Sequence, residues 1–148
     1  MRVALGSDHA GFALKTAIKA LLDEWTVPWE DFGTDTDASV DYPDFAEAVC
    51  RAVVAGRADC GILVCGTGIG MGIAANKIPG VRAAVVWDEA SAHLGRAHND
   101  ANVMAIGGRT TPAGRLPGIV DAFLHTTYEG GRHDSRLEKI AHLERKDP

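Results

Sequence analysis

The stretch Cys60–Gly72, CGILVCGTGIGMG, decides the fold of this 148-residue chain. Its first half is a short, continuously apolar run, which is typical of a strand buried on both faces of a parallel sheet. Its second half alternates glycine with other residues and leads into a segment of helical period. A strand, a glycine-rich turn and a helix in this order predict an α/β sheet with crossover helices.

The same alternation of apolar runs and helical segments continues on both sides and predicts one domain over residues 1–148. The expected strands are Arg2–Gly6, Val27–Phe32, Asp59–Cys65, Arg82–Trp87 and Asn102–Gly107. The expected helices are Ala10–Glu24, Tyr42–Ala55, Gly68–Lys77, Glu89–Arg96 and Pro112–His125, the last starting later or kinked because Pro117 and Gly118 interrupt it. A further amphipathic helix, Ser135–Arg145 within residues 133–146, follows a complete sheet and packs on its own domain or on a partner.

Composition and charge exclude several classes of protein. Hydrophobic residues make up 46% and charged residues 24%, which excludes disorder and fibrous repeats. The net charge is −5 and no basic stripe is present, which argues against a nucleic-acid binder. No apolar run approaches the roughly 20 residues of a membrane helix, so we expect no membrane partner and a cytoplasmic location.

The three cysteines, Cys50, Cys60 and Cys65, have no disulfide-framework spacing. Neither C-x-x-C nor H-E-x-x-H occurs, so no zinc or other metal site is expected. Cys50 and Cys60 are expected to be small core residues. Cys65 differs because the helix N-terminus that follows it favours the thiolate.

The glycine run does not fit the common dinucleotide-binding motif. Gly66, Gly68, Gly70 and Gly72 alternate, so the third glycine of G-x-G-x-x-G is missing, although Asp88 keeps a dinucleotide site open. What remains is a row of backbone N–H groups without side chains, which can hold phosphate or a developing oxyanion.

Cys65 beside this cradle leaves two chemistries open. A Cys–His hydrolase would use His98 or His9 as the partner, whereas an isomerase would use a base that removes a proton next to a carbonyl. A phosphatase would need arginine where Met71 stands.

Ligands of open parallel sheets bind beyond the carboxyl ends of the strands. The segments Gly6–Gly11, Cys65–Gly72 and Gly107–Arg109 fall there, and we expect His98, Asn99 and Asp100 to join them. His98 is the candidate for proton transfer near neutral pH.

Two of the candidate sites have a plain structural alternative. Asp8 could cap the first helix instead of binding a ligand. Arg132, His133 and Arg136 form a basic group that suits phosphate, with a solvated basic turn as the alternative.

Together these blocks resemble the type B ribose-5-phosphate isomerase family, which includes galactose-6-phosphate and allose-6-phosphate isomerases. The resemblance runs over essentially the whole chain, through GSDHAG, DYPDFA, CGTGIGMGIAANK, RAHNDANV and GGRH. It implies a three-layer α/β/α sandwich with a five-stranded, Rossmann-like parallel sheet of order 2-1-3-5-4. It also implies a homodimer, possibly paired into a tetramer, with active sites shared between subunits and no cofactor.

The resemblance also implies roles for individual residues in the interconversion of D-ribose 5-phosphate and D-ribulose 5-phosphate. Cys65 corresponds to the base and His98 to the acid that opens the sugar ring. The remaining counterparts are Gly66, Thr67, Gly68, Ile69 and Gly70 in the anion hole, Asp8 and Asn99 on the sugar, and His9, Arg109, Arg132 and Arg136 at the phosphate.

Other substrates remain open alternatives: allose 6-phosphate, galactose 6-phosphate or a tetrose phosphate, and beyond isomerases a phosphate- or nucleotide-binding module. One branch of the family has serine and glutamate where this chain has Cys65 and Ile69, which places the chain in the cysteine branch. Trp87 is less typical of the family and either alters the pocket or fills the core.

Overall fold

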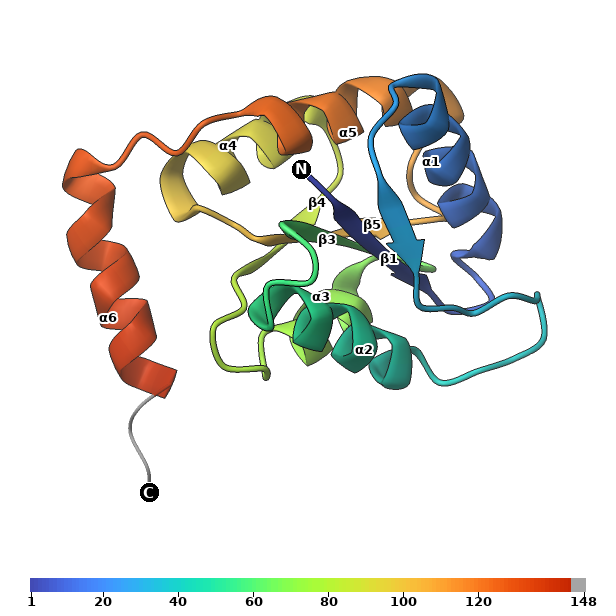
Figure 1. Cartoon of the computed structure of the whole chain (residues 1–148), viewed down its shortest axis with the longest axis horizontal. Helices are drawn as coiled ribbons and strands as arrows, with labels where there is room; N and C mark the ends of the chain where they lie inside the picture. Colours follow the sequence, from blue (N-terminus) through green and yellow to red (C-terminus); the bar gives the residue numbers. More distant parts are fainter. Residues whose placement is uncertain (145–148) are drawn as a thin grey trace.

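Five strands form the centre of the computed structural model, which describes residues 1–144 (Figure 1). They are β1 (Val3–Ser7), β2 (Trp29–Asp31), β3 (Cys60–Cys65), β4 (Ala83–Val86) and β5 (Val103–Gly107). All neighbouring pairs are parallel and the order is β2-β1-β3-β5-β4. The predicted sheet and its strand order are therefore confirmed.

Helices cover both faces of the sheet, as the prediction of a three-layer sandwich requires (Figure 1). One face carries α1 (Phe12–Glu24), α4 (Glu89–Asn99) and α5 (Leu116–His125), and the other carries α2 (Tyr42–Val54) and α3 (Ile69–Ala75). Two short 3-10 helices, η1 (Ala113–Arg115) and η2 (Gly131–His133), precede α5 and α6 (Asp134–Glu144).

The central strands are apolar throughout because each of their faces meets a helix layer. In β3, Ile62 and Val64 pack toward α1 and α5, whereas Leu63 and Cys65 pack toward α2 and α3. Every residue of β1, β3 and β5 is buried. This sandwiching explains the unbroken apolar run in the sequence.

Several element boundaries differ from the prediction. The last sheet-covering helix, expected from Pro112, starts at Leu116 after η1, in line with the later start that Pro117 suggested. The helix expected to end at Arg96 runs on to Asn99, because Asp100 supplies the left-handed turn (φ 42°) that closes it. Strand β2 is only three residues long.

Helix α6 stands clear of the two helix layers (Figure 1). None of its residues is buried. Its end meets the rest of the chain where the Gly80 N–H donates to Glu144 Oε2 at 3.0 Å. Residues 145 and 146 of the expected helix lie outside the described residues. Across residues 1–144, no helix has the length and apolar character needed to cross a membrane.

Candidate active site

The carboxyl ends of β1, β3 and β5 meet at one edge of the sheet. Ser7 pairs with Val64, and Cys65 pairs with Gly107, so the loops that follow these strands lie side by side. The Gly108 N–H donates to the Cys65 carbonyl at 2.7 Å, and the Asp8 N–H donates to the Val64 carbonyl at 3.1 Å. These backbone hydrogen bonds join the predicted site segments into one surface.

Cys65 ends β3 with only 5% of its surface exposed. The Gly68 N–H donates to its Sγ at 3.2 Å. Gly68 reaches this position with a φ of 80°, which a residue with a Cβ rarely adopts.

The other two cysteines have a different environment. Burial raises the pKa of both Cys50 and Cys60 to about 12, so neither is a thiolate near neutral pH. Both lie in the core, and the prediction that they are core residues is confirmed.

The floor of the site consists of glycine backbone, and side chains from other segments occupy the space that a Cβ on these glycines would need. A Cβ on Gly66 would lie 3.3 Å from the Arg109 guanidinium, and one on Gly70 would lie 2.7 Å from the Tyr42 ring. Arg109 is also tied to the loop because its N–H donates to the Gly66 carbonyl at 3.0 Å. The structure thus brings a cation and an aromatic ring over a row of N–H groups, which suits an anionic ligand.

Thr67 and Ile69 are exposed beside this floor, and the Ile69 N–H donates to Thr67 Oγ1 at 3.3 Å. Tyr42 had no role in the sequence analysis, although it lies in the block DYPDFA. The sequence showed only that Tyr42 begins a helix, because its approach to Gly70 depends on the packing of α2 against α3.

Asp8 and His9 follow β1 at the same edge. Asp8 is 6% exposed, and its Oδ1 accepts a hydrogen bond from the Gly11 N–H at 2.9 Å. Asp8 therefore stabilises the turn before α1, but the expectation that it could cap the helix is wrong, because the N-cap is Gly11 and it has no side-chain cap. The Val40 N–H donates to His9 Nδ1 at 3.3 Å, which leaves the proton of the neutral ring on Nε2.

His98 lies near the amino end of β5, at the edge of the sheet opposite to Cys65, so the expectation that it joins the segments at the carboxyl ends of the strands is wrong. Helix α4 runs back from the carboxyl end of β4, and the residues after it begin β5: the Asn102 N–H donates to the Arg82 carbonyl at 3.1 Å. From Val103 to Gly107 the strand rises about 13 Å. Proton transfer between a base and its partner needs contact near 3 Å, which excludes a Cys65–His98 pair in one chain.

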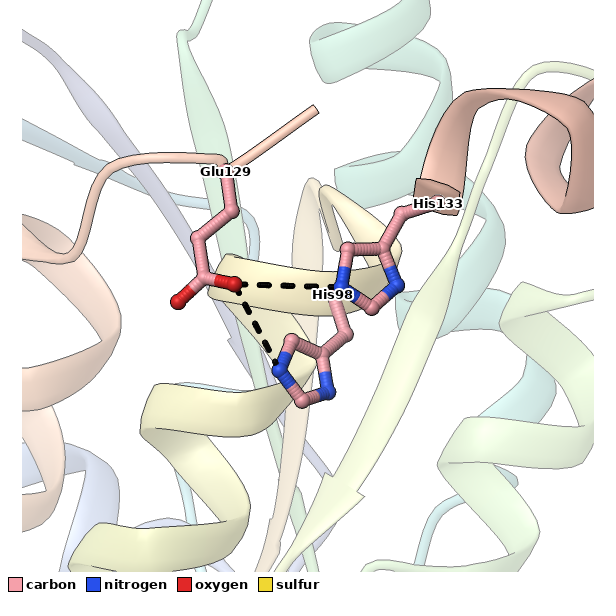
Figure 2. A group of neighbouring side chains, drawn as sticks. All are labelled: His98, Glu129 and His133. Carbon is pink, nitrogen blue, oxygen red and sulfur yellow. Dashed lines mark ion pairs between the residues drawn. The ribbon is translucent and has the colours of Figure 1, made fainter. Parts of the chain in front are cut away.

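Asn99, Arg132 and Arg136 lie on the His98 side. Asn99 follows His98 in α4, and the His98 and His133 rings stack with centroids 4.2 Å apart (Figure 2). Arg132 and Arg136 flank His133 and are both exposed, with Arg136 donating to the Arg132 carbonyl at 3.2 Å. The basic group is thus attached to the His98 side of the sheet.

Burial, followed by the charges of His98, Arg132 and Arg136, lowers the pKa of His133, so its ring is neutral near neutral pH. Glu129 reaches both rings: its Oε2 lies 3.7 Å from His98 Nε2 and 3.8 Å from His133 Nε2 (Figure 2). Glu129 was not predicted from the sequence, and His133 was expected only as part of the basic group with Arg132 and Arg136, since no motif spacing links either residue to His98.

The family model described as Ribose/Galactose Isomerase matches residues 3–140. The chain belongs to the ribose/galactose isomerase family. The "Ribose-5-phosphate isomerase B" of Escherichia coli is 48% identical over 145 residues, which cover 98% of this chain and 97% of that protein.

Solved structures of this isomerase family agree with the fold throughout. Ribose-5-phosphate isomerase B of Clostridium thermocellum superposes with a TM-score of 0.96 at 46% identity, covering 98% of each chain. The enzyme of Mycoplasma genitalium, solved with bound ribulose-5-phosphate, gives a TM-score of 0.92 at 41% identity and covers 99% of this chain and 97% of that one.

The structure clarifies two residues, Asp88 and Trp87, whose roles the sequence left open. Asp88 caps α4: the Ser91 N–H donates to its Oδ1 at 2.7 Å, and hydrogen bonds from Ser91 lower its pKa. This capping role accounts for the acidic residue that had kept a dinucleotide site open. Trp87 is 64% exposed and so does not fill the core of this chain.

Proposed function

We propose that this protein is an aldose–ketose isomerase that interconverts D-ribose 5-phosphate and D-ribulose 5-phosphate. The observation that carries the proposal is the Cys65 thiol held at the end of β3, with its Sγ accepting the Gly68 N–H beside a floor of glycine backbone. This is a base next to oxyanion donors, as an enediolate mechanism requires. The names of the Escherichia coli and Mycoplasma genitalium relatives support the substrate.

In the proposed reaction, the Cys65 thiolate removes the C2 proton of the open-chain aldose. The electron pair forms the C1–C2 double bond of an enediolate, and the negative oxygen accepts hydrogen bonds from N–H groups of the anion hole, which is the segment 66–70. A proton then passes from O2 to O1 of the enediolate, and the thiol returns its proton to C1 as the C2–O2 double bond forms, which gives the ketose. Oxyanion donors contribute about 3–4 kcal/mol each when well placed, so the loop is as important as the base.

We further propose that the working unit is a homodimer whose active sites combine opposite edges of two chains. Cys65, Asp8, His9 and Arg109 would come from one chain, and His98, Asn99, Arg132 and Arg136 from the other. The separation of about 13 Å along β5 supports this arrangement, because neither edge has all the groups the reaction needs. In it, His98 opens the sugar ring, Asp8 and Asn99 hold sugar hydroxyls, and His9 with the three arginines holds the phosphate.

Helix α6 supports the same assembly. It stands clear of its own chain (Figure 1) and exposes Ile140 (41%) and Leu143 (67%), which a second subunit would cover. A cavity of 210 Å³ opens between α6 and the β4 edge, and Asn99 lines it together with Ile140. The exposed Trp87 directly follows β4, the edge strand on this side of the sheet.

The proposed chemistry uses only protein groups, because proton transfer and oxyanion binding need neither metal nor organic cofactor. We place the enzyme in the cytoplasm, since its three unpaired cysteines fit a reducing compartment.

The test is a coupled assay of the purified protein on ribose 5-phosphate and ribulose 5-phosphate, without added metal. Allose 6-phosphate, galactose 6-phosphate and a tetrose phosphate are measured in parallel. We expect efficient turnover of the pentose phosphates only. Preference for a six- or four-carbon phosphate would overturn the substrate but keep the mechanism, and no turnover of any sugar phosphate would favour a phosphate-binding module.

A further inference from the structure

Three side chains that ligate metals in other proteins converge on the His98 side of the sheet (Figure 2). One donor atom each from His98, Glu129 and His133 lies within 4.8 Å of the other two. They come from α4, from the segment after α5 and from η2. Because these three residues match no metal-binding motif, no metal was expected from the sequence.

The cluster, hereafter the His98–Glu129–His133 cluster, is held together by the fold. The Glu129 N–H donates to the Ala97 carbonyl at 3.0 Å, which ties its segment to the residue before His98. The two imidazole rings stack with an interplanar angle of 15°. The positions of all three side chains are therefore coupled through backbone and ring contacts.

One donor atom has no hydrogen-bond partner among the described residues. The His133 side chain is 8% exposed, and its Nε2 is buried without a hydrogen-bond partner among residues 1–144. That nitrogen faces Glu129 Oε2 at 3.8 Å, beyond hydrogen-bond distance. Buried polar atoms in native proteins almost always have a partner, so this nitrogen points to a ligand between the three side chains.

We propose that the His98–Glu129–His133 cluster binds a Zn²⁺ ion, and that the bound ion inhibits the isomerase by occupying His98. Two imidazoles and one carboxylate are the donor set of three-ligand zinc sites that keep a fourth position open. The inhibition rests on the proposed function, since it needs His98 as the ring-opening acid, whereas the binding of zinc does not.

Geometry and charge set the character of the site. Tetrahedral zinc with bonds of about 2.1 Å holds its donors about 3.4 Å apart, so the Glu129–histidine distances of 3.7 and 3.8 Å need to close by a few tenths of an ångström. The three donor atoms as a set lie within 4.8 Å of one another, so the two histidine nitrogens need to approach as well. The His98 ring, whose side chain is 34% exposed, must turn out of its stack on His133, because two stacked rings cannot both direct a lone pair at one ion. The Glu129 side chain is 55% exposed and has room to make that move. Arg132 and Arg136 repel a cation, so we infer a reversible inhibitory ion rather than a permanent structural one.

Binding is measured on the metal-free full-length chain by competition for Zn²⁺ with a chromophoric chelator. Co²⁺, which gives a visible spectrum in tetrahedral sites, serves as a second probe. We expect one ion per chain, and an increase in Kd of at least about tenfold in Glu129→Gln and in His133→Asn. Glu129 is exposed, so its variant decides the question if His133→Asn fails to fold.

Two matched variants separate this site from other zinc ligands. His125→Asn removes an exposed histidine that also faces a carboxylate, Asp121, at 2.9 Å, and Cys65→Ser removes the thiol. Both should keep the wild-type affinity for zinc. No binding by the wild type, unchanged affinity in Glu129→Gln, or loss of binding only in Cys65→Ser would overturn the site.

Inhibition is then measured with ribose 5-phosphate, and each variant is compared with its own rate without zinc. Zinc should inhibit the wild type competitively, and Glu129→Gln should need at least about tenfold more zinc for the same inhibition. Zinc that binds the cluster without slowing an active enzyme would overturn the inhibition. An inactive wild type that still binds zinc would instead refute the proposed function and leave the metal site standing.

Discussion

Subunit complementation tests whether the active sites are shared between chains. Shared sites and sites within single chains predict opposite results. Cys65 and His98 lie at opposite ends of strands about 13 Å long, so one chain cannot bring both to the same sugar. In a two-fold dimer, each site would combine Cys65 of one chain with His98 of the other. A heterodimer of a Cys65→Ala chain with a His98→Asn chain then has one intact site and one site that lacks both groups.

The expected activity follows from counting sites. The complementing heterodimer should show about half the wild-type kcat per dimer, with the wild-type KM, although each homodimeric variant is inactive. The matched control pairs a wild-type chain with a chain carrying both substitutions. In that heterodimer each site lacks one group, so it should be inactive.

The two chains would be coexpressed with different affinity tags, purified in succession and assayed with ribose 5-phosphate. Sites confined to single chains would reverse the result: the control would keep about half the activity and the complementing pair would have none. That reversal would refute the placement of His98 opposite the partner's catalytic edge.

Three further substitutions test single groups. Cys65→Ala should lower kcat by at least about 10²–10⁴-fold while sugar-phosphate binding, followed by calorimetry, is largely kept; full activity would remove Cys65 as the base. Arg136→Ala should raise KM with kcat nearly unchanged, because a phosphate anchor acts equally on ground and transition states, and an unchanged KM would make it a surface residue. Burial would raise the pKa of Asp31, but hydrogen bonds from Lys15 and Lys19 outweigh it and lower that pKa. Its stabilisation is therefore present above about pH 4 and is lost as the pH falls further. Asp31→Asn, which leaves the buried Lys15 without its anion, should cost about 3–5 kcal/mol at pH 7 and less at pH 3 in urea unfolding; an equal loss at both pH values would contradict this.

The catalytic edge could be predicted from the sequence because it depends on residues that are close together in the chain. The apolar run ending at Cys65 identifies a buried strand, and parallel strands put the residues that follow them at one edge. The same rule explains the error at His98. A residue that directly precedes a strand lies at the amino edge, so the position of His98 before β5 contained the correct answer.

The remaining parts of the site depend on tertiary packing. Tyr42 reaches Gly70 only because α2 and α3 pack side by side on one face. Glu129 reaches His98 only because its N–H bonds to the end of α4. Neither contact has a characteristic spacing, since each joins segments whose separation in the sequence is set by loops.

The separation of the two edges also has a chemical consequence. A thiolate base and an imidazole acid in direct contact would exchange a proton with each other, as in thiol hydrolases. Here the sheet keeps Cys65 and His98 of one chain apart, and only the substrate would bridge them in the proposed dimer. The Cys65 Sγ accepts the Gly68 N–H and has no histidine partner in its own chain, while Glu129 and His133 lie against His98. The arrangement therefore favours carbon-acid chemistry over hydrolysis, and it leaves the acid side open to control by a metal ion independently of the base.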